Sequence, residues 1–203
     1  MRILKMKIED NVLLNLIEAK SRVLDIGCGD GNLLLILKKN KSINGRGIEI
    51  NQKKVTECLS KGLAVIEGDA EKDLINYPDN SFDFAILNQS LQQFYNPRKV
   101  LNDLLRIADK AIITIPNFGY WKVRLNLLLE GKMPITKTLP YNWFDTPNLH
   151  MSTIKDFYFL CEMDKIRILK SISVTTNKFS DINYRNLNIK NLISEIGVFL
   201  ITK

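Results

Sequence analysis

Apolar positions along the chain follow two spacings that alternate in a regular way. Apolar residues three or four positions apart indicate helices, whereas short and nearly continuous apolar runs indicate strands buried on both faces. The expected helices cover residues 8–19, 32–39, 52–60 and 97–108. The expected strands cover residues 22–26, 45–50, 63–67, 82–88 and 111–115, and a polar stretch at 70–81 should be a loop with a turn. This alternation predicts an α/β fold in which right-handed crossovers place helices on both faces of a mostly parallel sheet.

The alternation stops after Pro116. Residues 117–150 contain three prolines, both tryptophans and the only histidine, without a clear strand. A connection of this length is too long to be idle in a compact domain. We therefore expect an insertion after the fifth strand, helical over 123–130, that lies as a lid over the ligand end of the sheet. A helix over 153–161, a strand over 165–174, an exposed asparagine-rich segment at 177–191 and a last strand over 193–202 should follow. The prediction is a single domain, residues 1–203, with a seven-stranded sheet.

Charge along the chain bears on its partners. The formal net charge is +7, which raises the possibility of a nucleic-acid partner. Residues 1–116 carry 17 basic against 15 acidic side chains, and residues 117–203 carry 12 against 7. The excess is scattered singly rather than gathered into runs, so a solvated surface is the favoured interpretation and nucleic acid is an unlikely partner.

Composition also bears on location. No apolar run approaches the roughly 18 residues that span a bilayer, and the basic start of the chain lacks the apolar core of a signal peptide. The three cysteines, Cys28, Cys58 and Cys161, are odd in number and lack the spacing of metal ligands. These features predict a cytoplasmic protein with no membrane contact and no metal site.

A glycine-rich turn follows the first expected strand, in the pattern Asp25-x-Gly27-x-Gly29-x-Gly31. Glycines let the backbone turn sharply and approach a ligand closely, and the following helix presents its amino terminus. A dinucleotide fingerprint requires its third small residue one position later, where this chain has Asn32. A carboxylate at Asp25 would repel a pyrophosphate, whereas it suits a ligand that carries an ammonium group. The turn, Cys28 included, therefore favours S-adenosyl-L-methionine (SAM) or S-adenosyl-L-homocysteine over a dinucleotide.

Polar residues close the next three expected strands. Glu49 can accept hydrogen bonds from ribose hydroxyls, Asp69 lies within plausible reach of an adenine amino group, and Asn88 lies on the same rim. Ligands of open α/β sheets bind at the carboxyl ends of the strands, where all these positions fall. The predicted cofactor-binding residues are Asp25, Gly27, Cys28, Gly29, Gly31, Glu49, Ile50, Asp69, Ala70 and Asn88.

These motifs resemble those of class I SAM-dependent methyltransferases, and the segments downstream are similar to one family, the MetW proteins of methionine biosynthesis. The segments that carry this second resemblance are 82–92, Pro116-Asn117-Phe118-Gly119-Tyr120-Trp121, 131–134, 139–141 and Asp145-Thr146-Pro147-Asn148-Leu149-His150. The resemblance implies a role in methionine synthesis beside homoserine O-acyltransferase, which the chain would support or regulate. The alternative is an active SAM-dependent methyltransferase with a small-molecule acceptor.

No catalytic residue stands out. The fourth strand is followed by Asn88-Gln89-Ser90-Leu91 rather than the Asn/Asp-Pro-Pro-aromatic run that grips a flipped base. His150, with Asp145 nearby in sequence, is the only histidine for a general-base mechanism, and fixing the insertion is its favoured role. Methyl transfer can proceed by proximity and orientation alone, so the lack of a base does not decide between the two functions.

Overall fold

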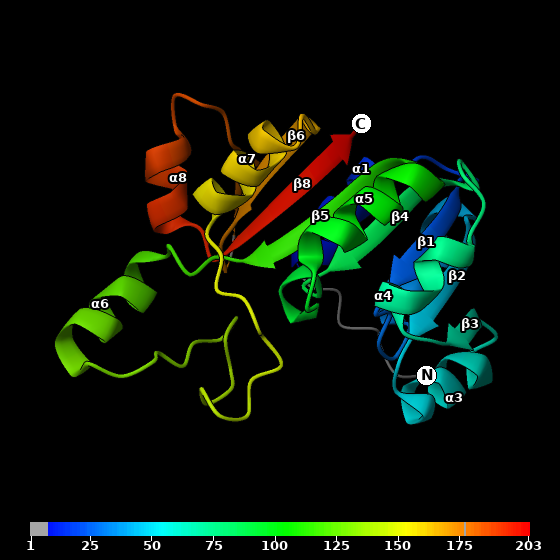
Figure 1. Cartoon of the computed structure of the whole chain (residues 1–203), viewed down its shortest axis with the longest axis horizontal. Coiled ribbons are helices and arrows are strands. Elements are labelled where there is room, and N and C mark those ends of the chain that lie inside the picture. Colours follow the sequence, from blue (N-terminus) through cyan, green and yellow to red (C-terminus); the bar gives the residue numbers. More distant parts are fainter. Residues whose placement is uncertain (1–7, 177) are drawn as a thin grey trace.

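Eight strands form one sheet in the order β3-β2-β1-β4-β5-β8-β6-β7 (Figure 1). The structure, a computed structural model, describes residues 8–176 and 178–203. The strands are β1 (Arg22–Ile26), β2 (Asn44–Glu49), β3 (Ala64–Glu67), β4 (Phe82–Asn88), β5 (Ala108–Pro116), β6 (Arg167–Val174), β7 (Phe179–Asp181) and β8 (Ile196–Thr202). Strands β1 to β5 pair in parallel, β8 lies antiparallel between β5 and β6, and β7 is antiparallel to β6. The predicted mostly parallel α/β fold is confirmed.

The predicted number of seven strands is wrong by one. The additional strand, β7, pairs with Ile172–Val174 at the edge of the sheet. It has three residues, all exposed, so its sequence carries no apolar pattern that would reveal it. The same polar segment forms helix α8 (Leu187–Ile193), and the last strand consequently begins at Ile196 rather than at residue 193.

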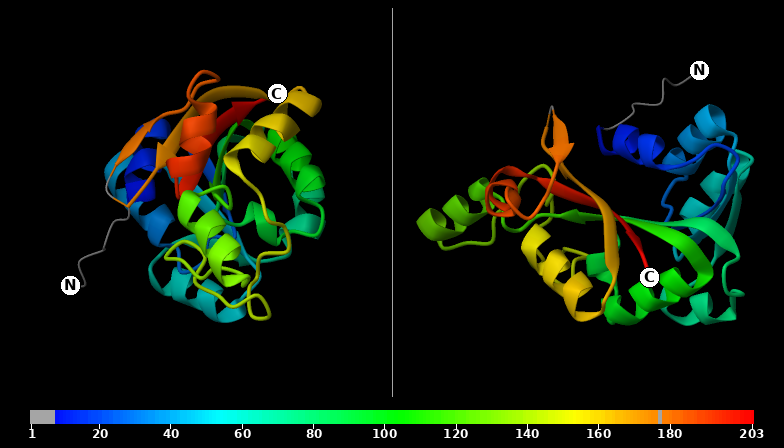
Figure 2. Two further views of the ribbon diagram at one scale, coloured as in Figure 1. Left: turned by 90° about the vertical axis from the view of Figure 1, so that its left-hand side faces the viewer. Right: turned by 90° about the horizontal axis from the view of Figure 1, so that it is seen from above.

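Helices cover both faces of the sheet (Figure 2). One face is packed by α1 (Ile8–Leu16), α2 (Asn32–Lys41) and α3 (Gln52–Ser60), and the other by α4 (Ala70–Asp73), α5 (Pro97–Ile107) and α7 (Ile154–Met163). Each face has its own buried apolar cluster, with Leu13 and Leu34 in the first and Leu104 and Phe157 in the second. Within the described ranges, no helix is long and apolar enough to cross a membrane.

The segment at residues 70–81 is more ordered than the predicted loop. It contains α4 and the 3-10 turn η1 (Leu74–Asn76). Asp69 caps the amino end of α4, since its Oδ1 accepts from the Glu71 amide at 3.1 Å while its own amide donates to Asp73 Oδ2 at 2.7 Å. Two carboxylates thus satisfy amides that a helix start leaves unpaired, which explains why so short and polar a segment is helical.

The five parallel strands bring their carboxyl ends to one edge of the sheet. Asp25 pairs with Gly47 and Ile86 on its two neighbours, and Asn88 pairs with Thr114. Strands β1 and β4 are neighbours in the sheet, and the connections that follow them run toward opposite edges of the sheet. This is the switch point at which open α/β sheets bind ligands.

The insertion, residues 117–150, starts at this same edge and projects beyond it (Figures 1 and 2). Its helix α6 (Trp121–Glu130) ends at Gly131, which has φ +62°. A small cluster of Tyr120, Val123 and Leu139 is the apolar core of the insertion.

Asn117 fastens the root of the insertion. Its buried side-chain Nδ2 donates to the Asn191 and Ser194 carbonyls, both at 2.8 Å. Its Oδ1 accepts from the amides of Gly119 at 2.9 Å and Ile154 at 3.2 Å. One amide therefore joins the two ends of the insertion to the end of α8.

We expect Asn117→Ala to lower the free energy of unfolding by about 2–4 kcal/mol, because four buried backbone groups lose a partner together. Urea denaturation measures this. Asn126→Ala, on the half-buried side of α6, is the control and should change stability by less than about 0.5 kcal/mol. Equal effects of the two substitutions would contradict the role of Asn117.

Candidate functional site

A cavity of about 610 Å³ opens at the carboxyl edge of the sheet. Its walls come from the segments that follow β1, β2, β3 and β4, and include Gly27, Glu49, Ile50, Asp69, Ala70 and Asn88. Further lining residues were not predicted: Asn51, Lys54, Glu71, Lys72, Gln89, Ser90, Gln93, Phe94 and Tyr95. Most of these lie within three residues of a predicted one, so proximity to a strand end was the available signal. Phe94 and Tyr95 had none, since η2 (Leu91–Gln93) brings them to the cavity.

The glycine turn has the backbone geometry that its sequence requires. Gly27, Gly29 and Gly31 have φ values of +67°, +59° and +74°, a region that side chains disfavour. The Gly27 amide donates to the Ile48 carbonyl at 2.8 Å, which holds the turn against β2. A Cβ at Gly27 would lie 3.4 Å from Ser90 Cβ, so Gly27 also permits the close approach of the chain after β4.

Asp25, at the end of β1, is buried beneath the turn with 1% of its surface exposed. Its Oδ1 has no hydrogen-bond partner among the described residues. Burial first, and then the charges of Glu49 and Asp10, raise the pKa of the Asp25 carboxyl to about 7. A buried acceptor near two other carboxyl groups creates a negative potential that favours a cationic ligand.

Glu49 ties the turn to the end of β2. Its Oε2 accepts from the Gly29 amide at 2.8 Å and its Oε1 accepts from the Asn51 amide at 3.0 Å. A carboxylate oxygen can accept more than one hydrogen bond, so Glu49, which lines the cavity, retains acceptor capacity.

Asp69 and Asn88 both make hydrogen bonds within the protein. Besides capping α4, Asp69 pairs with Lys72 at 2.8 Å, and this hydrogen bond is the main reason that the pKa of the Asp69 carboxyl is lowered. Asn88 Oδ1 accepts from Thr114 Oγ1 at 2.7 Å. The proposed adenine contact of Asp69 stays a prediction.

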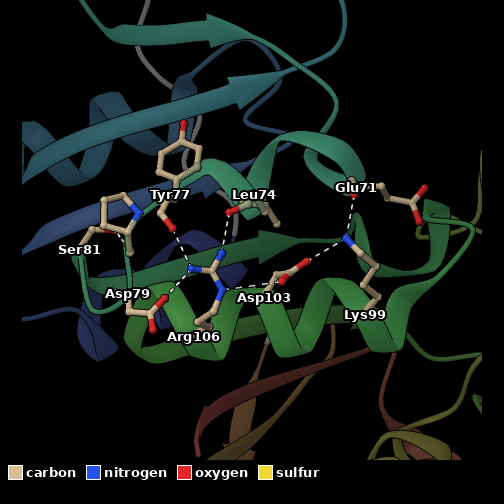
Figure 3. Close-up of polar contacts among 9 residues, drawn as sticks. Glu71, Leu74, Tyr77, Asp79, Ser81, Lys99, Asp103 and Arg106 are labelled. Atoms are coloured by element: carbon tan, nitrogen blue, oxygen red, sulfur yellow. Dashed lines mark hydrogen bonds and ion pairs between the residues drawn. The ribbon is translucent and has the colours of Figure 1, made fainter.

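Arg106 of α5 contacts Leu74, Tyr77 and Asp79 in the segment that follows α4 (Figure 3). The cavity residues Asp69 and Ala70 lie at the start of α4. The Arg106 guanidinium donates to the carbonyls of Leu74 at 2.8 Å and Tyr77 at 2.7 Å, and to Asp79 Oδ1 at 2.6 Å. These contacts reach Leu74 at the start of η1 and Tyr77 and Asp79 beyond it, so one side chain of α5 holds the segment after α4 in place.

The other predicted residues, Asp25, Cys28, Gly29 and Gly31, are not among those that line the cavity. The Cys28 side chain belongs to the buried cluster beneath α2 and α3, as does that of Cys58, whose Sγ donates to the Gly29 carbonyl at 3.3 Å. Burial raises the pKa of both thiols, which keeps them protonated and poorly nucleophilic. Cys28 therefore contributes backbone, rather than chemistry, to the turn.

A second cavity, of about 630 Å³, lies between α7, β6 and the segment after β7. Its walls include Tyr158, Arg167 and Tyr184 and none of the predicted site residues. It lies away from the carboxyl ends of the parallel strands. The cavity near the glycine turn is therefore the candidate site.

Among the described residues, no hydrogen bond joins His150 to Asp145, the residue considered as able to orient it. Asp145 instead faces Asn142, with 3.5 Å between Asp145 Oδ2 and Asn142 Nδ2. The His150 amide donates to the Gln92 carbonyl at 3.1 Å, which attaches the end of the insertion to η2. No group of three or more His, Cys, Asp or Glu among residues 8–176 and 178–203 is arranged to hold a metal ion.

Solved structures define the class of protein. A SAM-dependent methyltransferase of Thermotoga maritima, described as a possible histamine N-methyltransferase, superposes with a TM-score of 0.69 at 17% identity, over 96% of this chain and 87% of that one. A SAM-dependent methyltransferase of Archaeoglobus fulgidus gives 0.69 at 18% identity, over 96% and 91%. The chain has the class I methyltransferase fold.

Sequence comparison defines the family. The family described as "Methionine biosynthesis protein MetW" matches residues 8–201. The bifunctional methionine biosynthesis protein MetXA/MetW of Rhodopirellula baltica is 32% identical over 160 residues, which are 74% of this chain and 26% of that protein. The chain thus corresponds to about a quarter of this relative. It belongs to the MetW family, as its residues after Pro116 predicted.

We expect Gly31→Ala to destabilise the protein by roughly 3 kcal/mol, because strain at positive φ adds to overpacking. An added Cβ would lie 2.5 Å from Leu63 Cδ1 and 2.8 Å from Cys58 Sγ. Gly29→Ala is the matched control, since its φ is also positive while nothing lies within 4 Å of the added Cβ. It should cost about 1–2 kcal/mol in the same urea titration. A greater loss of stability for Gly29→Ala than for Gly31→Ala would contradict the close packing of Leu63 and Cys58 against Gly31.

Proposed function

We propose that this chain binds SAM in the cavity beside the glycine turn and, in response, supports or regulates a homoserine O-acyltransferase. The observation that carries the cofactor assignment is the buried Asp25 carboxyl, whose Oδ1 has no hydrogen-bond partner within residues 8–176 and 178–203. Asp25 directly precedes Ile26 and Gly27, which line the cavity, so the α-ammonium group of SAM bound there would bring a positive charge close to this buried carboxyl. A pyrophosphate would bring two negative charges to the same place.

The remaining wall suits the other parts of SAM. Glu49 has acceptor capacity for ribose hydroxyls, and the exposed side chain of Ile50 offers an apolar surface for an adenine ring. When bound, SAM would supply an activated methyl group. The described residues bind and orient this cofactor, while Ser90 and Gln89 close the side toward β4.

SAM affinity should depend on pH through Asp25. Because the pKa of the Asp25 carboxyl is about 7, the ligand must displace a proton at lower pH. The dissociation constant for SAM should therefore rise roughly tenfold between pH 7.5 and pH 6. Asp25→Asn should bind SAM weakly at both values and lose this dependence. Isothermal titration calorimetry measures both effects, and an unchanged affinity of Asp25→Asn would refute the placement of the ammonium group.

Stability separates this effect from unfolding. The pKa of Asp25 is raised from 3.8 in the folded protein, so its contribution to stability is present below about pH 4 and is lost as the pH rises through about 7. Without SAM, Asp25→Asn should therefore be more stable than the natural chain at pH 8. A variant that is more stable and yet binds SAM less tightly has lost a ligand contact rather than its fold.

The insertion carries the argument for a protein partner. Twelve of its residues and of those just after it expose large apolar side chains: Trp121, Leu125, Leu127, Leu128, Leu129, Met133, Ile135, Tyr141, Trp143, Phe144, Leu149 and Met151. We refer to these as the apolar surface of the insertion. Large exposed apolar side chains gathered in one short segment are typical of partner-binding regions, and aromatic side chains are enriched where partners bind.

The identity of the partner rests on relatives. The R. baltica relative joins MetXA and MetW in one bifunctional protein, which supports an association of the two parts. We infer that the MetXA part corresponds to the homoserine O-acyltransferase implied by the family. In this proposal the apolar surface of the insertion binds the acyltransferase as a separate chain, whereas in the fused relative the two parts are joined covalently.

Leu128→Asp should weaken binding to the acyltransferase at least about tenfold, because a charge replaces a side chain that is 80% exposed on α6. Leu59→Asp, the same change at a 55% exposed position on α3, should leave binding within about twofold. Analytical ultracentrifugation and the acyltransferase rate report the outcome. Equal binding by the two variants would exclude the insertion as the contact.

Active methyl transfer to a small molecule is the alternative, favoured by the likeness to SAM-dependent methyltransferase structures. In that case the insertion covers an acceptor. Incubation with methyl-labelled SAM and a pool of metabolites separates the two functions. Label transfer without any effect on the acyltransferase would favour the alternative.

A further inference from the structure

The η2 turn lies between the cofactor cavity and the last residues of the insertion, Leu149 and His150, which we call its returning limb. On one side, Gln89, Ser90 and Gln93 line the cavity. On the other, the amides of Leu149 and His150 donate to the Gln92 carbonyl at 2.9 and 3.1 Å. In the described part of the chain, these are the only hydrogen bonds by which residues 121–151 reach beyond the insertion and its root. The turn is therefore where cavity and insertion meet.

The backbone at this meeting point is strained. Gln89 has φ +56°, in the left-handed region that residues other than glycine disfavour. Its amide donates to the Thr114 carbonyl at 3.1 Å and to Thr114 Oγ1 at 2.8 Å, which holds it against β5. Its carbonyl accepts from the side-chain Nε2 of Gln92 at 2.9 Å and of Gln93 at 3.1 Å. The carbonyl of Gln89, a residue of the cavity wall, is thus hydrogen-bonded to the side-chain amide of Gln92, whose own carbonyl holds the insertion.

Gln92 itself is only partly satisfied. It is 4% exposed, and its Oε1 has no hydrogen-bond partner among the described residues. An unpaired buried acceptor and a strained neighbour both oppose the arrangement seen here. A segment under such opposition can have a second arrangement of similar free energy, which a ligand at its wall would disfavour or favour.

We propose that Gln92 couples the two regions, so that SAM in the cavity restrains η2 and thereby fixes the returning limb at Leu149 and His150. Cofactor occupancy then sets how the apolar surface of the insertion is presented to its partner. This inference rests on the SAM binding proposed above and adds the route by which that binding is transmitted.

The chain contains its own reporter for this coupling, because both of its tryptophans, Trp121 and Trp143, lie in the insertion. Saturating SAM should change the tryptophan emission of the full chain. It should also slow deuterium exchange of the peptide that contains the Leu149 and His150 amides by about threefold or more, since η2 becomes restrained. Calorimetry on the same samples establishes that SAM is bound.

Gln92→Met tests the residue. It removes both polar atoms of the amide while keeping its length, and Gln92 does not line the cavity. SAM affinity should stay within about threefold, while the emission change falls to less than about half. Gln52→Met makes the same change at an exposed position on α3 and should keep the full response.

The outcomes are distinguishable. SAM bound by calorimetry with neither an emission change nor protection of residues 149–150 overturns the coupling while leaving the proposed function intact. A full response in Gln92→Met overturns the role of its side chain. Absence of SAM binding by the natural chain would refute the proposed function and this inference together. The exchange measurement needs no variant, so poor folding of Gln92→Met would not remove the test.

Discussion

The carboxyl group of Asp25 is buried where no described residue is a partner for its Oδ1, and the rest of the candidate site is arranged around that constraint. Desolvation disfavours the charged form, and Glu49 and Asp10 add to the effect. Such a group lowers the stability of the folded chain at neutral pH, and a cationic ligand reverses this by supplying the missing charge. Under the proposed function, SAM binding would therefore stabilise the folded chain. Glu49 contributes structurally as well, because it holds the Gly29 amide and so keeps the turn over Asp25.

Much of this arrangement was predictable from the order of residues. Strands β1 to β5 have apolar runs that end at Ile26, Glu49, Glu67, Asn88 and Pro116, and polar or glycine residues at or after these ends mark one edge of the sheet. The glycine spacing at 27, 29 and 31 predicted a sharp turn, and the backbone has one, with positive φ at all three glycines. Periodicity and spacing are local properties, so they survive without knowledge of the tertiary contacts.

What could not be predicted depends on partners distant in sequence. Arg106 holds the segment after α4 from a helix about thirty positions later, and nothing around Arg106 marks it as different from any surface arginine. Strand β7 forms because it pairs with the edge strand β6. Helix α4 depends on two aspartates, since Asp69 accepts from the Glu71 amide and Asp73 accepts from the Asp69 amide. The positive φ of Gln89 is similar, since it depends on Thr114 of the neighbouring strand. These features follow from packing rather than from pattern.

The insertion brings the two kinds of information together. Its sequence resembles the MetW family, and its structure explains how a helix rich in exposed leucines can be held in place with only a small apolar core. Asn117 fastens the root through four hydrogen bonds, while Gln92 holds the returning limb through two. All polar atoms of the Asn117 amide have partners, whereas Gln92 Oε1 has none among the described residues. If the proposed coupling holds, the insertion changes its position at the Gln92 attachment, beside the candidate cavity, while the Asn117 attachment is kept. Occupancy of the cavity and exposure of the apolar surface are therefore expected to change together.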